Sequence, residues 1–373
     1  MPGTENEVAL RDPPRDGVTA IRWHPSAGYN SLLVSSWDST VRLYNSTENS
    51  LRTNLEQPCP VLDADFVDDS RAVSAGLDGI VRLHDFHSAA ESVVGSHENS
   101  VRCVRQCTNV GPSCIVSGSW DHCVKLWDLR ASDANVCSIR QPNKVLSLCT
   151  GVPVMNTSGK PLLVVATAGR QVVLSDLRKP GDALQRRESS LKAQTRCVAQ
   201  MPSGEGYTIG SVDGRVAVEY VDPAPESQER KYVDCCMIPL IALHIAHALL
   251  PTEVRLILLY RFVFRSHRLT VGGVDTSFPV NVIAFHPRYG TFATGGCDGN
   301  IYVWDGIKRK RVCALRRYHT SISALAFSPG GDSMAVAASY TYENGDVAHP
   351  EDAIFIRRLS ENEVKSKASA PAA

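Results

Sequence analysis

The sequence lacks several features that would point directly to a function. Its 39 lysines and arginines balance 39 aspartates and glutamates, so it has no basic excess of the kind that coats DNA or an anionic membrane. The twelve cysteines include no Cys-x-x-Cys pair, the close spacing that zinc sites need. Residues 1–11 are polar and carry no apolar core of a secretion signal. We therefore expect reduced thiols in a cytosolic or nuclear protein with no direct DNA contact and no membrane partner.

Enzyme signatures are missing as well. There is no Gly-x-Ser-x-Gly elbow, and the stretch 151–160 has the wrong spacing for a phosphate loop and runs into Pro161. Four potential metal ligands lie close together in the sequence: Cys235, Cys236, His244 and His247. Two adjacent cysteines cannot easily both face one tetrahedral ion. We expect no enzymatic activity, no cofactor and no metal.

What the chain does contain is an internal repeat. The segments 35–44, 75–85 and 118–128 align, and each carries an aspartate followed by an alternating Val-x-Leu strand pattern. The three aspartates, 40 and 43 residues apart, are Asp38, Asp78 and Asp121. This spacing matches the period of about 40 to 45 residues that WD-repeat blades show.

Four weaker copies bring the number of units to seven: 168–176, 212–220, 296–305 and 334–358. The count predicts an all-β fold, a seven-bladed WD-repeat propeller. Only closure of the ring removes unpaired strand edges, so we expect the segment 8–10 to supply the outer strand of the last blade. The propeller would occupy residues 1–362 as a single domain, followed by a disordered tail, 363–373.

One segment does not fit the repeat. Asp213 and Asp298 are 85 residues apart, about two blade periods, and the surplus is the apolar segment 233–261. Its apolar core is interrupted by Pro239 and is shorter than the roughly 20 residues that a membrane span requires. Two interpretations stay open: an unspliced intron in the gene model, which we favour, and a lineage-specific apolar loop. A translated segment at this place could block the neighbouring residues 264–268.

Four residues of the third blade predict a buried hydrogen-bond network that fixes a blade turn: His97, Ser117, Asp121 and Trp127. Such a set could be mistaken for a hydrolase triad, but its order and its place in the repeat favour the structural role. The sixth blade carries part of the same set, with no histidine at the matching upstream position: Thr294, Asp298 and Trp304.

Several longer stretches resemble the WD-repeat spindle-checkpoint proteins of the Bub group: 34–44, 118–121, 185–192, 194–197, 214–220 and 349–357. The resemblance covers nearly the whole chain. The related WD-repeat messenger-RNA export factor, which binds a nucleoporin, shares the fold and several motifs and stays the alternative. The runs 186–192 and 349–352 look more like the checkpoint branch.

The resemblance implies a non-catalytic adaptor that works as a monomer within complexes. It would bind a short acidic motif of the checkpoint kinase and of its pseudokinase relative. It would also bind phosphothreonine in Met-Glu-Leu-Thr repeats of the kinetochore scaffold. Through the checkpoint complex it could reach the anaphase-promoting complex. It would act in the nucleus, at kinetochores in mitosis, and in the cytoplasm. The family's acidic-motif residues correspond to Trp37, Trp120 and Arg196. Its phosphothreonine residues correspond to Arg215, Arg265 and Arg268.

These residue types suit the implied roles. An exposed tryptophan is rare on a surface that binds nothing, and a guanidinium group offers two parallel N–H donors to a phosphate. The alternatives are that the tryptophans pack between blades and that the arginines form a solvated rim. A further possibility is that the propeller is the substrate receptor of a ubiquitin ligase.

Overall fold

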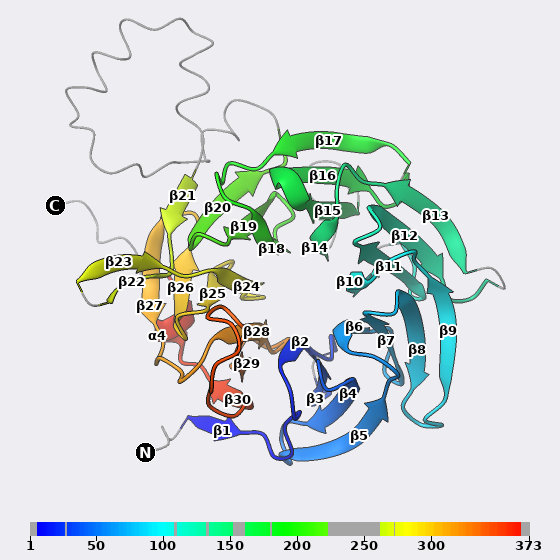
Figure 1. Cartoon of the computed structure of the whole chain (residues 1–373), viewed down its shortest axis with the longest axis horizontal. Helices are drawn as coiled ribbons and strands as arrows, with labels where there is room; N and C mark the ends of the chain where they lie inside the picture. The colour runs from blue at the N-terminus through cyan, green and yellow to red at the C-terminus, as the bar shows by residue number, and fades with distance from the viewer. Residues whose placement is uncertain are drawn as a thin grey trace, which may run out of the picture.

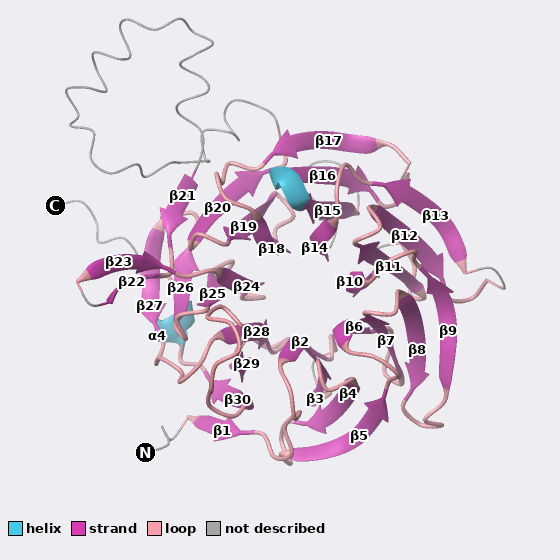
Figure 2. Ribbon diagram, viewed as in Figure 1, coloured by secondary structure: helices cyan, strands magenta, loops and turns pink. Residues whose placement is uncertain are grey.

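A computed structural model describes residues 6–26, 28–107, 110–131, 134–151, 161–179, 181–222, 262–271 and 273–366. Seven four-stranded antiparallel sheets follow one another in a ring (Figure 1), and we call them blades 1 to 7. Figure 2 shows that almost all regular structure in the described ranges is strand. The predicted seven-bladed all-β propeller is confirmed.

From the centre outward, blade 1 contains β2 (Val18–Trp23), β3 (Ser31–Ser36), β4 (Thr40–Asn45) and β5 (Ser50–Glu56). Blade 2 contains β6 (Val61–Phe66), β7 (Arg71–Gly76), β8 (Ile80–Asp85) and β9 (Glu91–Ser96). Blade 3 contains β10 (Val101–Gln106), β11 (Cys114–Ser119), β12 (Cys123–Asp128) and β13 (Asn135–Arg140). Blade 4 contains β14 (Val145–Thr150), β15 (Leu162–Thr167), β16 (Gln171–Asp176) and β17 (Ala183–Glu188). Blade 5 contains β18 (Thr195–Gln200), β19 (Gly206–Ser211), β20 (Arg215–Tyr220) and β21 (Phe262–Arg265). A short 3-10 turn, η1 (Ala168–Arg170), joins β15 to β16.

Blade 6 contains β24 (Val280–Phe285), β25 (Phe292–Gly296), β26 (Ile301–Asp305) and β27 (Lys310–Ala314). Blade 7 contains β28 (Ile322–Phe327), β29 (Ser333–Ala338), β30 (Ala353–Arg358) and β1 (Glu7–Ala9). A separate two-stranded hairpin lies between blades 5 and 6 in the sequence: β22 (Arg268–Val271) and β23 (Val274–Ser277). The helix α4 (Glu361–Val364) follows the last blade.

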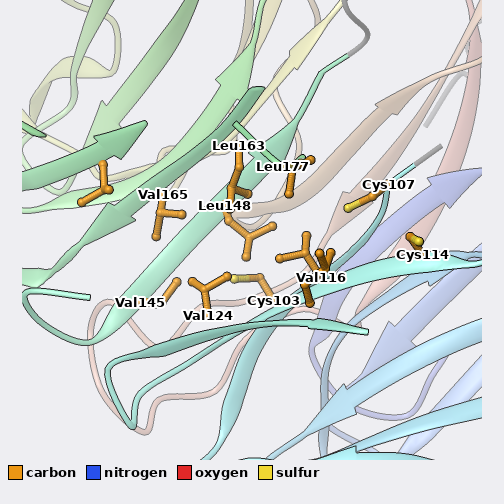
Figure 3. Close-up of a cluster of buried hydrophobic side chains, with 12 residues drawn as sticks. Cys103, Cys107, Cys114, Val116, Val124, Val145, Leu148, Leu163, Val165 and Leu177 are labelled. Carbon is orange, nitrogen blue, oxygen red and sulfur yellow. The ribbon is translucent and has the colours of Figure 1, made fainter. Parts of the chain in front are cut away.

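The blades pack face to face, and this packing explains the burial pattern of their strands. β3 and β15 are buried along their whole length, whereas the outer strand β17 alternates between half-buried and exposed residues. Small apolar side chains fill the space between neighbouring blades. Figure 3 shows the cluster between blades 3 and 4, which includes Cys103, Val116, Leu148 and Val165. Removal of this apolar surface from water, repeated around the ring, stabilises the fold.

The cysteines belong to this packing. All ten cysteines in the described ranges are free, and burial raises the pKa of the Cys103, Cys149 and Cys197 thiols to about 12. A thiol with such a pKa stays protonated near neutral pH and is a poor nucleophile.

The N-terminal strand closes the ring. β1 pairs antiparallel with β30, with Val8 opposite Ile356, and so forms the outer strand of blade 7 as predicted. The side chain of Glu7 is almost fully buried and forms ion pairs with Arg316 and, at 3.6 Å, with Arg357. These contacts tie the first strand of the chain to the last blade, so the outer edge of β30 is paired rather than left open.

Two regions differ from what the repeat alone suggests. The surplus segment 233–261 lies outside the described residues, but β21 still pairs with β20 as the fourth strand of blade 5. Part of the segment expected to be a disordered tail is ordered, because α4 covers Glu361–Val364 and Val364 is buried. The hydroxyl of Thr291 donates to the Val364 carbonyl over 2.6 Å. Residues 367–373 lie outside the described ranges.

The network residues of blade 3 lie together. His97 Nδ1 is 2.9 Å from Asp121 Oδ2, and His97 Nε2 is 2.7 Å from Ser117 Oγ. Trp127 Nε1 donates to the same Ser117 hydroxyl over 2.8 Å. The Ser117 side chain is fully buried, so a substrate cannot reach this set of residues.

Blade 6 corrects one expectation. We predicted no upstream histidine there, but His267 Nδ1 lies 2.7 Å from Asp298 Oδ1 and His267 Nε2 lies 3.1 Å from Thr294 Oγ1. Trp304 Nε1 completes the set by donating to Thr294 over 3.0 Å. His267 stands 31 residues before Asp298, against 24 for the pair in blade 3, because the hairpin of β22 and β23 lies between them. The longer spacing hid the histidine from the repeat.

Candidate functional site

A ring of bulged residues surrounds the centre of the propeller. The innermost strand of every blade shifts its pairing register just after its first residue, which is the mark of a β-bulge. The residues at these shifts are Thr19, Leu62, Arg102, Leu146, Arg196, Asn281 and Ser323. Bulges re-aim side chains. All seven residues line one or both of two cavities at the centre of the ring.

The larger of these two cavities, with a volume of about 500 Å³, brings together the three residues expected to bind an acidic motif. Trp37, Trp120 and Arg196 all line it, although they come from blades 1, 3 and 5. We call it the central cavity. Trp37 is 42% exposed, and Trp120 and Arg196 are half-buried. The structure therefore places both tryptophans around the centre of the ring.

The tight turns of the repeat position both tryptophans. Each follows the second strand of its blade and donates its backbone N–H to the preceding loop, Trp37 to Gly17 over 2.9 Å and Trp120 to Ser100 over 3.0 Å. The next residue is the repeat aspartate, and Asp121 accepts the backbone N–H of Cys123 over 2.8 Å. The sequence thus holds a large ring at a fixed place beside the cavity.

These aspartates are charged. Burial is the largest single influence on Asp121 and opposes its ionisation, but the hydrogen bond and charge of His97, together with the backbone N–H groups of Cys123 and Glu98, lower the pKa of the carboxyl. In blade 1 burial is again outweighed, here by hydrogen bonds from Thr40 and the Arg15 backbone, so the pKa of Asp38 is lowered. Both turns therefore keep their anchoring carboxylates down to mildly acidic pH.

Sequence reasoning missed three further residues of the central cavity. Arg102 is one, and its bulge position brings it to the same cavity as Arg196. The loop between β29 and β30 adds Tyr340 and Tyr342. Tyr342 is 58% exposed and has a left-handed backbone, with φ of 57°, which is uncommon for a bulky residue. Tyr340 stacks on His349 with 4.8 Å between ring centroids, and this histidine begins a motif that marked the family resemblance.

The three arginines expected to bind phosphate come from neighbouring chain segments. Arg215 and Arg265 stand directly opposite each other on β20 and β21, and Arg268 begins β22. Like charges opposite each other on paired strands are destabilising, so an anion at this place would relieve the repulsion. Arg215 Nε lies 3.2 Å from Asp213 Oδ2, and Arg268 forms an ion pair with Asp275.

A glycine fixes the approach of these segments. Gly214 has a left-handed backbone, with φ of 77°, and a Cβ there would lie 2.6 Å from the carbonyl oxygen of His267. The Gly214 carbonyl accepts the backbone N–H of Ser266 over 2.8 Å. Arg215 and Arg265 therefore face each other because a residue without a side chain lets the two segments meet.

Within the described residues, no group of three or more histidine, cysteine, aspartate or glutamate side chains is arranged to hold a metal ion. The possible ligands Cys235, Cys236, His244 and His247 lie outside those residues. In the described part of the chain, no helix has the length and apolar character needed to cross a membrane.

Comparisons with known proteins agree with this architecture. The family model "WD domain, G-beta repeat" matches residues 9–45, 91–128 and 262–305. The chain is 39% identical to the mitotic checkpoint protein bub3 of Dictyostelium discoideum, over 97% of this chain and 98% of that one. It is 42% identical to the mitotic checkpoint protein BUB3.1 of Arabidopsis thaliana, over 96% and 94%. The chain belongs to the Bub3 family of WD-repeat mitotic checkpoint proteins.

The resemblance stated from the sequence is thus confirmed. Members of the related export branch are also similar: the chain is 32% identical to the poly(A)+ RNA export protein of Schizosaccharomyces pombe, over 97% of this chain and 93% of that one. Among solved structures, that of U3-55K superposes with a TM-score of 0.72 at 14% identity, over 96% of this chain and all of that one. This last likeness shows the propeller fold alone.

Proposed function

We propose that this Bub3-family chain is a non-catalytic adaptor of the spindle assembly checkpoint. Its central cavity binds a short acidic motif of the checkpoint kinase and its pseudokinase relative. Its arginine cluster, Arg215, Arg265 and Arg268, binds phosphothreonine in Met-Glu-Leu-Thr repeats of the kinetochore scaffold. The adaptor then recruits the kinases to unattached kinetochores, acts in the nucleus and cytoplasm, and reaches the anaphase-promoting complex through the checkpoint complex.

The observation that carries the first half is the composition of the central cavity. Two tryptophans, Trp37 and Trp120, stand beside two arginines, Arg102 and Arg196, in one cavity of about 500 Å³. Aromatic rings and guanidinium groups are the side chains that dominate binding energy at protein interfaces. An acidic peptide laid across this cavity could place apolar groups on the rings and carboxylates on the arginines.

The second half rests on the arginine cluster. Arg265 and Arg268 are exposed and Arg215 is half-buried, so all three can be reached by a ligand at the edge of blade 5. A charge-assisted hydrogen bond contributes about 1.5 to 3 kcal/mol. Two such bonds would favour a phosphorylated peptide over its unphosphorylated form by roughly a hundredfold or more.

The export branch supplies the second candidate function, because relatives of that branch match nearly the whole chain at 30% and 32% identity. In that function the central cavity would take a nucleoporin motif, and RNA would replace the kinetochore scaffold. The balanced charge of the chain gives no general support for RNA binding.

Binding of the purified full chain to two peptides tests the proposal. One is an acidic-motif peptide from a checkpoint kinase, and the other is a Met-Glu-Leu-Thr peptide with and without phosphate. We expect Trp37→Ala to weaken the first peptide at least about tenfold, and Arg215→Ala to weaken only the phosphorylated form of the second to a similar degree. Arg52→Ala changes an exposed arginine on β5, outside both sites, and serves as the matched control.

The outcomes separate the two functions. Phosphate-dependent binding that is lost in Arg215→Ala supports the checkpoint adaptor. Acidic-motif binding with equal affinity for both forms of the second peptide contradicts the phosphothreonine site and favours the export function. Binding of neither peptide overturns both halves of the proposal.

A further inference from the structure

Three blades place a flat ring with a ring nitrogen at the same position of their third strand, and blade 1 places the Tyr44 ring there. The three nitrogen-bearing rings are Trp127 in blade 3, Trp304 in blade 6 and His84 in blade 2. Each ring nitrogen lies within 3.0 Å of a hydroxyl group on the neighbouring second strand: Ser117, Thr294 and Ser74 respectively. The ring thus fills the outer part of the space toward the preceding blade and satisfies a buried hydroxyl group there.

Blade 4 has a serine at this position. In blade 3, Trp127 stands two residues after Lys125, which pairs with Ser117. In blade 4, Ser175 stands two residues after Val173, which pairs with Val165. The inner part of the interface between blades 3 and 4 is filled by the apolar cluster of Figure 3. The outer part, where a ring would lie, is hollow.

This hollow, which we call the blade 3–4 pocket, has a volume of about 150 Å³. Its lining includes Gln141, Val173, Ser175, Ile139 and Arg186. Ser175 is only 2% exposed, so the pocket reaches into the buried part of the interface. A cavity of about 150 Å³ is large enough to hold a benzene-sized ring.

One wall of the pocket carries a buried acceptor that lacks a donor. Gln141 donates its backbone N–H to the His122 carbonyl over 2.7 Å in blade 3, just as Gln57 donates to the Ser39 carbonyl in blade 1, so the two glutamines stand at equivalent positions and each faces the next blade. The side chain of Gln57 lies 3.0 Å from the ring of His84. Gln141 is 5% exposed, and its Oε1 has no hydrogen-bond partner in the described structure. Such an atom costs about 1 to 3 kcal/mol unless a donor reaches it.

The remaining walls suit a ring that enters from the rim. In β9 the residue beneath the Trp127 ring is Gly95, where a Cβ would lie 2.3 Å from that ring. The equivalent residue of β13 is Ile139, which lines the pocket and packs against the apolar cluster between blades 3 and 4. The exposed Arg186 stands directly opposite Val173, at the mouth of the pocket. A cation there could cover a bound ring, as Lys125 Nζ does for Trp127 at 5.7 Å.

We propose that the blade 3–4 pocket binds an aromatic side chain of a partner protein, one that carries an N–H or O–H donor. The donor would reach Gln141 Oε1, and the ring would occupy the place that Trp127 and Trp304 fill in their own blades. The site is separate from the central cavity and the arginine cluster, and it does not depend on the function proposed for them.

Indole and benzothiophene test the pocket, because the two rings have nearly the same shape but only indole carries an N–H donor. We expect the full chain to bind indole with a dissociation constant of about 1 mM, and benzothiophene at least fivefold more weakly. Calorimetry or ligand-observed NMR can measure both. Gln141→Leu should remove the preference for indole, and Trp37→Ala, in the central cavity, should change neither affinity.

Filling the pocket gives the second test. Ser175→Trp should abolish binding of both rings. Because the new side chain lies beside Ile139 and can prevent folding, Ser175→His, which copies blade 2, serves as a smaller filling variant. Absence of saturable indole binding would show that water alone occupies the pocket and would overturn the proposal. Equal affinity for indole and benzothiophene would also overturn the proposal. So would binding that persists in both Ser175 variants but is lost in Trp37→Ala, because the rings would then bind in the central cavity.

Discussion

The histidine of blade 6 provides the sharpest stability prediction. His267 is fully buried and joins two partners on other strands or turns, Asp298 at 2.7 Å and Thr294 at 3.1 Å. His267→Ala removes both hydrogen bonds. The Asp298 side chain, which is fully buried, would keep only its hydrogen bonds from Asn300. Burial opposes its ionisation, and the lost histidine is the leading group that lowers the pKa of this carboxyl.

The magnitude follows from the burial of both groups. Removing one partner of a buried pair costs about 3 to 5 kcal/mol, because the other is left without compensation. Each kcal/mol shifts the melting temperature of a domain of this size by roughly 2 °C. We therefore expect His267→Ala to melt about 6 to 10 °C below the wild-type protein in differential scanning calorimetry.

Two further variants calibrate this measurement. His97→Ala breaks the equivalent network of blade 3 and should give a shift of similar size. His319→Ala changes an exposed histidine and should shift the melting temperature by less than about 1 °C. If His267→Ala melts no earlier than His319→Ala, the network of blade 6 does not stabilise the fold, and the reasoning is refuted.

Three other predictions concern buried charge. Burial, and secondarily Arg82, lowers the pKa of His84 to about 4, so protonation of this residue favours the unfolded chain. Between pH 7 and pH 5 the free energy of unfolding should therefore fall by about 2 kcal/mol through His84. Urea titrations should show a weaker pH dependence of stability in His84→Gln. Asp63 is buried and accepts hydrogen bonds from Arg22, Arg105 and two backbone N–H groups. Asp63→Ala should therefore lower the free energy of unfolding by about 3 to 5 kcal/mol in the same assay. The control Asp69→Ala changes an exposed aspartate and should alter stability little. Glu7→Ala should loosen the closing strand, seen as faster proteolysis at the N-terminus; an unchanged cleavage rate would contradict the closure.

The repeat made most of the fold predictable. Its alternating strands and its period of about 40 residues are local features that sequence spacing reports directly, and the closing strand at residues 8–10 follows from the need to cover an edge. His267 was missed because an added hairpin changed its distance from Asp298. Residues 363–366 were assigned to a disordered tail because their burial depends on Thr291 and Cys313, which are distant in sequence.

The candidate site was only partly predictable. The three residues carried over for the acidic motif do share one cavity, but Arg102 and Tyr342 were not found. A bulge in a strand and a left-handed backbone in a loop leave no pattern in a single sequence. The blade 3–4 pocket was missed for a related reason: a serine in place of a tryptophan is visible only when the blades are compared in register.

A charge exchange at Arg196 tests the central claim most directly. Arg196→Glu should weaken binding of the acidic-motif peptide at least tenfold, whereas Arg52→Glu should leave it unchanged. The acidic residues of the peptide are then replaced by lysine one at a time. The proposed function predicts that one of these peptides binds Arg196→Glu at least tenfold more tightly than the original peptide does. If Arg196→Glu binds the original peptide as the wild type does, or if no lysine peptide regains affinity, the central cavity is not the acidic-motif site.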